Sequence, residues 1–449
     1  MGNNNNKKFD EMPKKLNIRT SSRRTYRRCP RKFYFFSEVK NFLHKEQSTE
    51  TNIHFWFGSG IHFVLEDYMG YNKFKDPRMA FKAYYESFNG DLPENSEEYY
   101  SLGFNMLTYF IEWNKEYNFS SRFKAAKDER GVPLLEVEFE LEMPIIALYD
   151  PIAQVYRGFK EIDDYDCVVR EVIASTKQNG AITNNVNGPD LCVNEDLIEV
   201  PVYYHGTVDG IFKDHKGNYY ILDYKTAKIA DVDKLVLDDQ ISAYCWGLEQ
   251  YLGIPIKGFI YMQLTKEVVQ KPRRLKNGEL SSDKRQKTLY KLLKQELSKD
   301  FPKGKIPKKY EELLDILLEK EDNNGNRFIR FDIVERSVKE KISTYENVLG
   351  EIRNMLSQEY FYPNPNKDCK WDCNIRELCI LKENREPIDL SDWTRQPIQA
   401  STKDTWRDNI KWPAEDYILP ENIEDEFKHL NVTDIDWDKL AELDDEFDF

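Results

Sequence analysis

The sequence predicts an α/β (α+β) fold, a mixed sheet flanked by helices, and three observations support this prediction. From Leu135 to Glu142 apolar residues alternate with glutamates, which is the pattern of a half-buried strand. Residues 202–225 hold two apolar runs around a polar loop, residues 213–218, which contains a glycine and indicates an antiparallel hairpin. Helical patterns precede and follow this hairpin, an order that is typical of a sheet covered by helices.

A polar arm, residues 1–18, opens the chain and is followed by a strongly basic segment. Ser21 or Ser22 is suited to cap a helix in this segment, although Pro30 lacks a backbone N–H and must break or restart it. A second helix is expected from Phe57 to about Tyr71. After the hairpin we expect a helix over about 234–251 and a further strand over 258–264.

Two stretches do not fit this regular order of elements. Residues 148–200 have an irregular pattern, and residues 266–345 form a basic loop followed by mostly helical patterns. We therefore expect one large domain over 19–385 with insertions at about these two places. Residues 386–449 are expected to form an acidic C-terminal tail.

Composition limits the class of protein. Of the 449 residues, 40% are hydrophobic and 14% aromatic, which predicts a folded chain. No run of eighteen apolar residues occurs, and residues 1–8 lack the apolar core of a signal peptide, so we expect no membrane segment. The expected compartment is a reducing cytoplasm, where cysteines serve as ligands or buried thiols more often than as disulfides.

The net charge of −14 is unevenly distributed. Residues 421–449 hold twelve acidic residues and two lysines, a net of −10, which leaves about −4 for the other 420 residues. A near-neutral body with basic patches and an acidic tail is compatible with a nucleic-acid partner. No phosphate-binding glycine loop with its lysine occurs, which argues against an ATP-driven motor in this chain.

The tripeptide Asp223-Tyr224-Lys225 ends the second apolar run of the hairpin. Side chains two apart on a strand share a face, so Asp223 and Lys225 are expected side by side. Asp209 lies on the preceding strand, and antiparallel pairing would bring the two aspartates together. Carboxylates bind Mg²⁺ or Mn²⁺, which activate water for attack on a phosphodiester, and a lysine beside them offsets negative charge. An isolated pattern of this kind is usually a solvated strand face.

Two helical pairs accompany this tripeptide. His62 follows a pair of glycines and lies one turn before Glu66, so that both share a face of the expected helix. Gln240 and Tyr244 are also four residues apart, where an amide and a phenol can contact a nucleotide or support the lysine. Ordinary helix packing is the alternative interpretation for both pairs.

Three cysteines, Cys369, Cys373 and Cys379, lie within eleven residues. Thiolates at such spacing bind zinc or an iron–sulfur cluster. A fourth ligand is missing locally, and Cys29 in the basic N-terminal segment is the best candidate for it. These residues alone leave the choice between zinc and iron–sulfur open.

Taken in chain order, these motifs resemble the RecB-like branch of the PD-(D/E)XK nuclease superfamily. They are most similar to its iron–sulfur members, namely the AddB-type nuclease domain, the CRISPR-adaptation nucleases and stand-alone phage exonucleases. The resemblance covers about residues 20–385. The motifs that carry it are Tyr26-x-x-Cys29-Pro30, Gly58-x-x-x-His62, Asp209, Asp223-x-Lys225, Gln240-x-x-x-Tyr244 and the cysteine triplet.

The resemblance implies a restriction-endonuclease-like fold and a role for each motif. His62, Asp209, Asp223 and the carbonyl of Tyr224 would bind Mg²⁺ or Mn²⁺, and Lys225 would act on the water or the phosphate. Gln240 and Tyr244 would place the DNA strand. The four cysteines would hold a 4Fe–4S cluster that joins the two ends of the domain. The first gap of the triplet is three residues where the family has two, which keeps zinc as an alternative.

The expected function is a metal-dependent DNA exonuclease that acts on single strands or DNA ends in phage or bacterial recombination, repair or replication. Arg273 and Arg274 lie in a basic window, residues 271–287, that is suited to bind phosphates. The alternatives are a non-catalytic DNA-binding or assembly protein with a relic nuclease fold, and a zinc-stapled endonuclease. The acidic C-terminal end is either a solubilising tail or a docking peptide for replication or recombination proteins.

Overall fold

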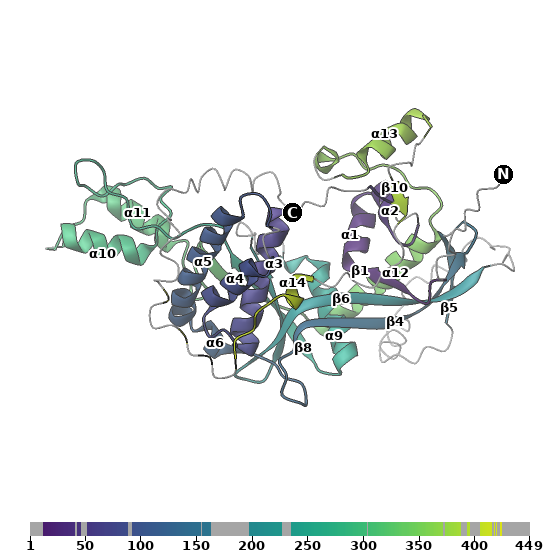
Figure 1. Ribbon diagram of the computed structural model, residues 1–449, viewed down its shortest axis with the longest axis horizontal. Helices are drawn as coiled ribbons and strands as arrows, with labels where there is room; N and C mark the ends of the chain where they lie inside the picture. Colours follow the sequence, from purple (N-terminus) through teal and green to yellow (C-terminus); the bar gives the residue numbers. More distant parts are fainter. Residues whose placement is uncertain are drawn as a thin grey trace.

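The structure is a computed structural model that describes residues 12–40, 43–45, 52–88, 92–153, 155–162, 197–226, 235–302, 304–370, 373–387, 393–395 and 405–414, with residues 417, 419 and 423. Its elements form three layers, a mixed sheet between two groups of helices (Figure 1). The expected fold class is therefore confirmed. None of the described helices is both long enough and apolar enough to cross a membrane.

The central sheet has eight strands: β1 Leu16–Arg19, β3 Phe123–Ala125, β4 Leu135–Asp150, β5 Val155–Glu161, β6 Ile198–Asp214, β7 Tyr219–Lys225, β8 Ile256–Leu264 and β9 Ile329–Glu335. Its order is β5-β4-β6-β7-β8-β9, with β1 and β3 also paired to β6. Strands β7 and β8 are parallel, as are β1 and β6, and the other pairs are antiparallel. The predicted hairpin is confirmed as β6 and β7.

One face of the sheet is covered by an aromatic-rich helical layer. Its helices are α3 Ile53–Glu66, α4 Pro77–Glu86, α5 Ser96–Tyr117 and α6 Phe119–Arg122, and α3 continues into a π-helical turn, Asp67–Tyr71. These helices share a core with β6, β7, β8 and β9. Gly60 allows α3 and α4 to approach closely, because a Cβ atom there would lie 2.6 Å from the Tyr84 ring.

The other face carries α1 Thr20–Arg28, α2 Pro30–Phe36, α9 Asp239–Leu252 and α12 Val338–Ser357. Pro30 is the first residue of α2, so the expected break in the basic helix is confirmed. Helix α12 begins with a reciprocal capping box between Ser337 and Glu340, which satisfies two backbone N–H groups. On α9, Gly247 makes room for the Phe139 ring of β4 at a place where a Cβ would lie 2.6 Å from it.

The expected insertions contain regular structure at their described ends. Strand β5 and the start of β6 lie within 148–200, while residues 163–196 lie outside the described part of the chain. Within 266–345, helices α10 Tyr290–Asp300 and α11 Lys308–Leu318 share a small core of their own and project from the body (Figure 1). Strand β9, from the same range, joins the central sheet because its apolar side chains face both helical layers.

The C-terminal region also contributes to the body of the protein. A 3₁₀ turn, Lys367–Cys369, leads to α13 Arg376–Asn384, and a two-stranded sheet pairs β2 Leu43–Lys45 with β10 Trp393–Arg395. Helix α14, Thr405–Asp408, lies within the range expected as tail. It packs against the aromatic layer through Trp406, and Ile410, two residues after its end, is buried in the same core. The acidic residues 424–449 lie outside the described part of the chain.

A buried arginine fastens the N-terminal basic helix to two others. Arg23 has no exposed surface, and its guanidinium bonds Glu351 of α12 at 2.7 Å and Asp239 of α9 at 2.9 Å. We expect Arg23→Ala to lower the free energy of unfolding by about 3 kcal/mol, because it breaks a buried ion pair and leaves two carboxylates facing each other. Urea unfolding would measure this loss.

The matched control is Arg27→Ala, which removes an arginine that is 40% exposed and pairs with the same two carboxylates. Solvent screens this pair, so we expect a loss below about 1 kcal/mol. Equal losses in the two variants would show that burial of Arg23 contributes nothing to stability.

Candidate metal centre

The candidate site lies where β6 and β7 separate. Their backbone pairing ends at Gly210 and Leu222, although β6 begins at Ile198 and β7 continues to Lys225. In the gap, the Tyr224 N–H donates a hydrogen bond of 2.6 Å to Oδ2 of Asp209. The Asp209 carboxylate therefore takes the place of a backbone acceptor and is held between the two strands.

A glutamate of the neighbouring strand lies opposite Asp209. The pairs Leu135–Gly210 and Val137–Val208 of β4 and β6 flank Glu136 and Asp209, which places these two residues across from each other. Glu136 has a φ of +47°, a left-handed conformation that is uncommon outside glycine and gathers at functional sites. It interrupts the regular alternation of β4 at the position that faces Asp209.

Helix α3 completes this group with His62. Nδ1 of His62 lies 3.4 Å from Oδ1 of Asp209. His62, Glu136 and Asp209 each offer one ligand atom, and these atoms lie within 4.8 Å of one another. One imidazole nitrogen and two carboxylate oxygens fit a divalent cation such as Mn²⁺ or Mg²⁺, whose other positions can hold water and substrate oxygen.

The charges of this group also suit a cation. Burial, and then the charges of Asp209 and Glu66, raise the pKa of Glu136 to about 7. Burial opposes ionisation of Asp209, yet His62, Lys225 and the Tyr224 N–H together hold the pKa of Asp209 below its usual value. Two carboxylates thus compete for one small space, and a divalent cation between them would relieve their repulsion.

Asp223 and Lys225 form an ion pair beside this group. Nζ of Lys225 lies 2.9 Å from Oδ1 and 2.8 Å from Oδ2 of Asp223. Burial would lower the pKa of Lys225, but Asp223 and Asp209 raise it above its usual value, so the lysine stays charged. The expected sharing of one face is confirmed, because Leu222 and Tyr224 point to the opposite side, into the core under α3.

The three-ligand group contains His62 and Asp209 but not Asp223, whose carboxylate lies against Lys225. Burial raises the pKa of Asp223, and Lys225 opposes this shift. The Tyr224 ring packs edge-on to the His62 ring, with centroids 5.9 Å apart. The buried hydroxyl of Tyr224 has no hydrogen-bond partner among the described residues. The Tyr224 carbonyl stays a predicted ligand.

Helices α1 and α9 meet on the Asp223 side of the centre. Nη2 of Arg24 donates a hydrogen bond of 2.7 Å to Oε1 of Gln240. Burial raises the pKa of Tyr244, whose hydroxyl has hydrogen-bonding neighbours in Thr20 and Gln240. The charges of Asp223 and Lys225 act on the same hydroxyl. Tyr244 is therefore within electrostatic reach of the ion pair, and the contact of Gln240 and Tyr244 with DNA stays a prediction.

The four predicted cysteine ligands gather at one end of the molecule. Cys29 lies between α1 and α2, and the electrostatic neighbours of Cys373 include Cys369 and Cys29, while those of Cys379 include Cys29 and Cys373. Among the described residues, no three cysteine sulfurs lie within 4.8 Å of one another. Cys245, by contrast, is buried in α9.

The two predicted DNA-binding arginines differ in their contacts. Arg274 forms salt bridges with Glu296 at 2.8 Å and with Asp300 at 3.0 Å, which fasten the basic loop to α10. The side chain of Arg273 is exposed, while its backbone N–H donates to Gln286 Oε1 at 2.8 Å. Of the two, Arg273 is the better placed to reach a phosphate.

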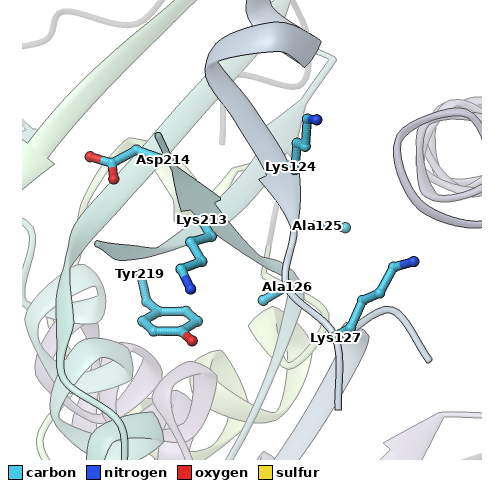
Figure 2. A pocket seen from close by; sticks show the side chains of 7 residues that line it. All are labelled: Lys124, Ala125, Ala126, Lys127, Lys213, Asp214 and Tyr219. Carbon is cyan, nitrogen blue, oxygen red and sulfur yellow. The ribbon is translucent and has the colours of Figure 1, made fainter. Parts of the chain in front are cut away.

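A hollow of about 260 Å³ lies away from the metal centre, at the hairpin end of β6 and β7. Figure 2 shows that Lys213 extends toward the Tyr219 ring, whose centroid lies 5.2 Å from Nζ, whereas Lys124 and Lys127 point in other directions. The lysines around this hollow do not converge, so it offers no built anion site.

Glu136 is the residue of this centre that the sequence did not reveal. It looks like one of four alternating glutamates on the polar face of a strand. The next two have other partners: Glu138 bonds His205 at 2.6 Å, and Glu140 bonds Lys15 at 2.5 Å. Only the register with Asp209 and the positive φ distinguish Glu136, and neither can be read from the local pattern.

Comparison with known proteins identifies a family for this chain. The sequence model of the PD-(D/E)XK nuclease superfamily matches residues 20–380. No curated protein shows a significant match to the chain. The matched range begins with the first residue of α1 and ends within α13, so it contains the whole metal centre and all four clustered cysteines.

Proposed function

Because the chain belongs to the PD-(D/E)XK nuclease superfamily, we propose that it is a Mg²⁺- or Mn²⁺-dependent deoxyribonuclease of the RecB-like branch. Its expected activity is that of an exonuclease on single-stranded DNA or DNA ends, in recombination, repair or replication. The observation that supports this most is the convergence of His62, Glu136 and Asp209 next to the Asp223–Lys225 ion pair. Nuclease chemistry needs this combination of a cation site and a fixed positive donor.

In this proposal each residue has a defined task. A divalent cation at the site would polarise a phosphate oxygen and lower the pKa of the attacking water. His62, Asp209 and Glu136 would hold the cation, with Asp223 and the Tyr224 carbonyl as further predicted ligands, and the Tyr224 N–H keeps the Asp209 carboxylate in place. Lys225, kept charged by Asp223, donates to the phosphate or to the water. Hydrolysis would leave a 5′-phosphate, as in the superfamily.

End-labelled single- and double-stranded DNA with Mg²⁺ or Mn²⁺ tests this function. We expect Asp223→Ala to lower the cleavage rate by at least about a hundredfold, because it releases the donor Lys225 from its fixed position. DNA affinity, measured by anisotropy without divalent cations, should stay close to that of the wild type. Glu112→Ala, which changes an exposed carboxylate on α5, serves as the control.

Absence of cleavage by wild-type protein with its cysteine-bound group intact would contradict the nuclease proposal. Such a result, together with normal DNA binding, would favour the second candidate, a non-catalytic DNA-binding or assembly protein. Products that arise from internal cuts would favour an endonuclease over an exonuclease.

We further propose that Cys29, Cys369, Cys373 and Cys379 bind a 4Fe–4S cluster. The resemblance to the iron–sulfur members of the superfamily supports this choice, and the mutual electrostatic contacts of Cys29, Cys373 and Cys379 place these thiols near one another. Lys32 and Arg31 lie close enough to act on Cys373 and Cys379 and would offset the negative charge of the thiolates. Zinc is the alternative ligand group.

The domain organisation completes the proposal. Residues 19–385 would form the nuclease domain, and the basic loop with α10 and α11 would add DNA-binding surface through Arg273 and Arg274. The acidic end of the chain would recruit replication or recombination proteins. This last role rests on sequence alone, because residues 424–449 lie outside the described part of the chain.

A further inference from the structure

A short C-terminal segment, residues 405–414, lies outside the family-matched range and yet packs against the helices of the metal centre. Trp406 contacts the rings of Phe63, Tyr84 and Phe88, with centroids 5.5, 4.7 and 6.4 Å away. Ile410 is buried in the same core. The segment is thus anchored on α3 and α4 by apolar contact.

A second anchor follows six residues later in the same segment. Trp412 packs against Phe63 and Phe74, with centroids 5.7 and 5.6 Å away. Nζ of Lys73 lies 4.2 Å from the centroid of the Trp412 ring, within the range of a cation–π contact. Along the chain Arg407 lies between Trp406 and Trp412, so the backbone is anchored both before and after it.

Arg407 reaches into the acidic centre from this anchored segment. Its Nη1 donates to Oε2 of Glu66 at 3.0 Å. Glu66 is only 8% exposed and lies one helical turn after His62. Residues four apart share a helix face, so Glu66 lies on the side of α3 that carries His62, and its charge acts on Glu136. Glu66 is therefore a carboxylate beside the three-ligand group but not a member of it.

We propose that Arg407 is a positioning residue of the nuclease centre, which binds Glu66 and thereby keeps this carboxylate from coordinating the cation. The inference rests on the proposed function, since it concerns the same cation site. With Glu66 held by Arg407, His62, Glu136 and Asp209 would bind the cation without competition from this further carboxylate. The C-terminal segment would then be a required part of the catalytic domain.

The proposal predicts opposite changes in binding and catalysis for Arg407→Gln. Loss of a positive charge and release of Glu66 should tighten Mn²⁺ binding about threefold to tenfold. The cation would be displaced toward Glu66, so the cleavage rate at saturating Mn²⁺ should fall at least about tenfold. A variant with merely disturbed packing would lose affinity and activity together.

Mn²⁺ binding is measured on the intact protein at pH 8 by electron paramagnetic resonance of free Mn²⁺, without DNA. Arg407→Lys should restore wild-type affinity and most of the activity. The double variant Arg407→Gln/Glu66→Gln should bring Mn²⁺ affinity back to near that of the wild type, because the released carboxylate is gone. If Trp406→Ala folds, it should also bind Mn²⁺ more tightly than the wild type. If it does not fold, the Arg407 variants alone test the proposal.

Unchanged or weaker Mn²⁺ binding by Arg407→Gln, in protein whose Tm equals that of the wild type, would overturn the inference. Failure of the double variant to reverse the tightening would also overturn it. Wild-type protein that neither binds Mn²⁺ nor cleaves DNA would instead contradict the proposed function, so the two failures are distinguishable.

Discussion

Asp209→Asn is expected to lower metal-dependent DNA cleavage by roughly a thousandfold or more while leaving the fold intact. Asparagine has nearly the same volume, and its Oδ1 can still accept the hydrogen bond from the Tyr224 N–H. Its NH₂ group would then face His62 and the cation in place of a carboxylate oxygen. Loss of a ligand charge removes several kcal/mol of transition-state stabilisation, and about 1.4 kcal/mol corresponds to tenfold in rate. Initial rates on end-labelled DNA at saturating Mg²⁺ measure the effect.

The matched control for this variant is Asp214→Asn on the same strand. The Asp214 carboxylate accepts hydrogen bonds from the backbone N–H groups of Lys216 and Asn218 in the β6–β7 turn, away from the centre. Asparagine can retain these bonds, so the control should cleave DNA at nearly the wild-type rate. A rate for Asp209→Asn within about tenfold of the wild type would exclude Asp209 as an essential metal ligand.

Cys379→Ser is expected to remove the cluster and to lower the free energy of unfolding by about 3–5 kcal/mol. The apolar contact that would remain between α2 and α13 is small, comprising mainly Phe35, Ile375, Leu378 and Trp393. The proposed cluster would join Cys29 to residues more than three hundred positions later, and a cross-link across so long a loop removes much chain entropy from the unfolded state. Urea unfolding, iron analysis and visible absorption of anaerobically purified protein measure both effects.

Cys245→Ala is the control, because Cys245 is buried in α9 away from the four clustered cysteines. It should keep the brown colour and the iron content of the wild type. If the wild-type protein is colourless and contains one bound zinc, the 4Fe–4S proposal is wrong and the zinc alternative holds. If the wild-type protein contains neither iron nor zinc, the four cysteines do not form a metal-bound cross-link.

Short-range patterns in the sequence identified the parts of the site that lie close together along the chain. The hairpin of β6 and β7, with Asp223 and Lys225 on one face, follows from the period-two alternation and a polar loop with a glycine. The helical position of His62 and the clustering of three cysteines follow equally from local spacing. These features depend on interactions between residues that are neighbours on one element or on two consecutive strands.

Contacts between elements that are distant in the sequence decided the roles of the other residues. In the sequence Arg23 is one of several arginines of the basic N-terminal segment, and only the packing of α1 on α9 and α12 makes it an internal ion-pair partner. Glu136 became part of the centre through the β4–β6 register and a left-handed backbone. Both outcomes depend on which element lies next to which, and residue spacing within one segment does not encode that.

The sequence by itself determined the fold class, the hairpin with its Asp-x-Lys tripeptide and the cysteine triplet, because local periodicity and residue chemistry suffice for each. The tertiary structure alone decided that β6 and β7 separate at Asp209, that Glu136 faces it, and that Arg407 returns to Glu66 from 341 residues away. The physical reason is that cross-strand register and the docking of Trp406 into an aromatic core depend on the packing of the whole chain.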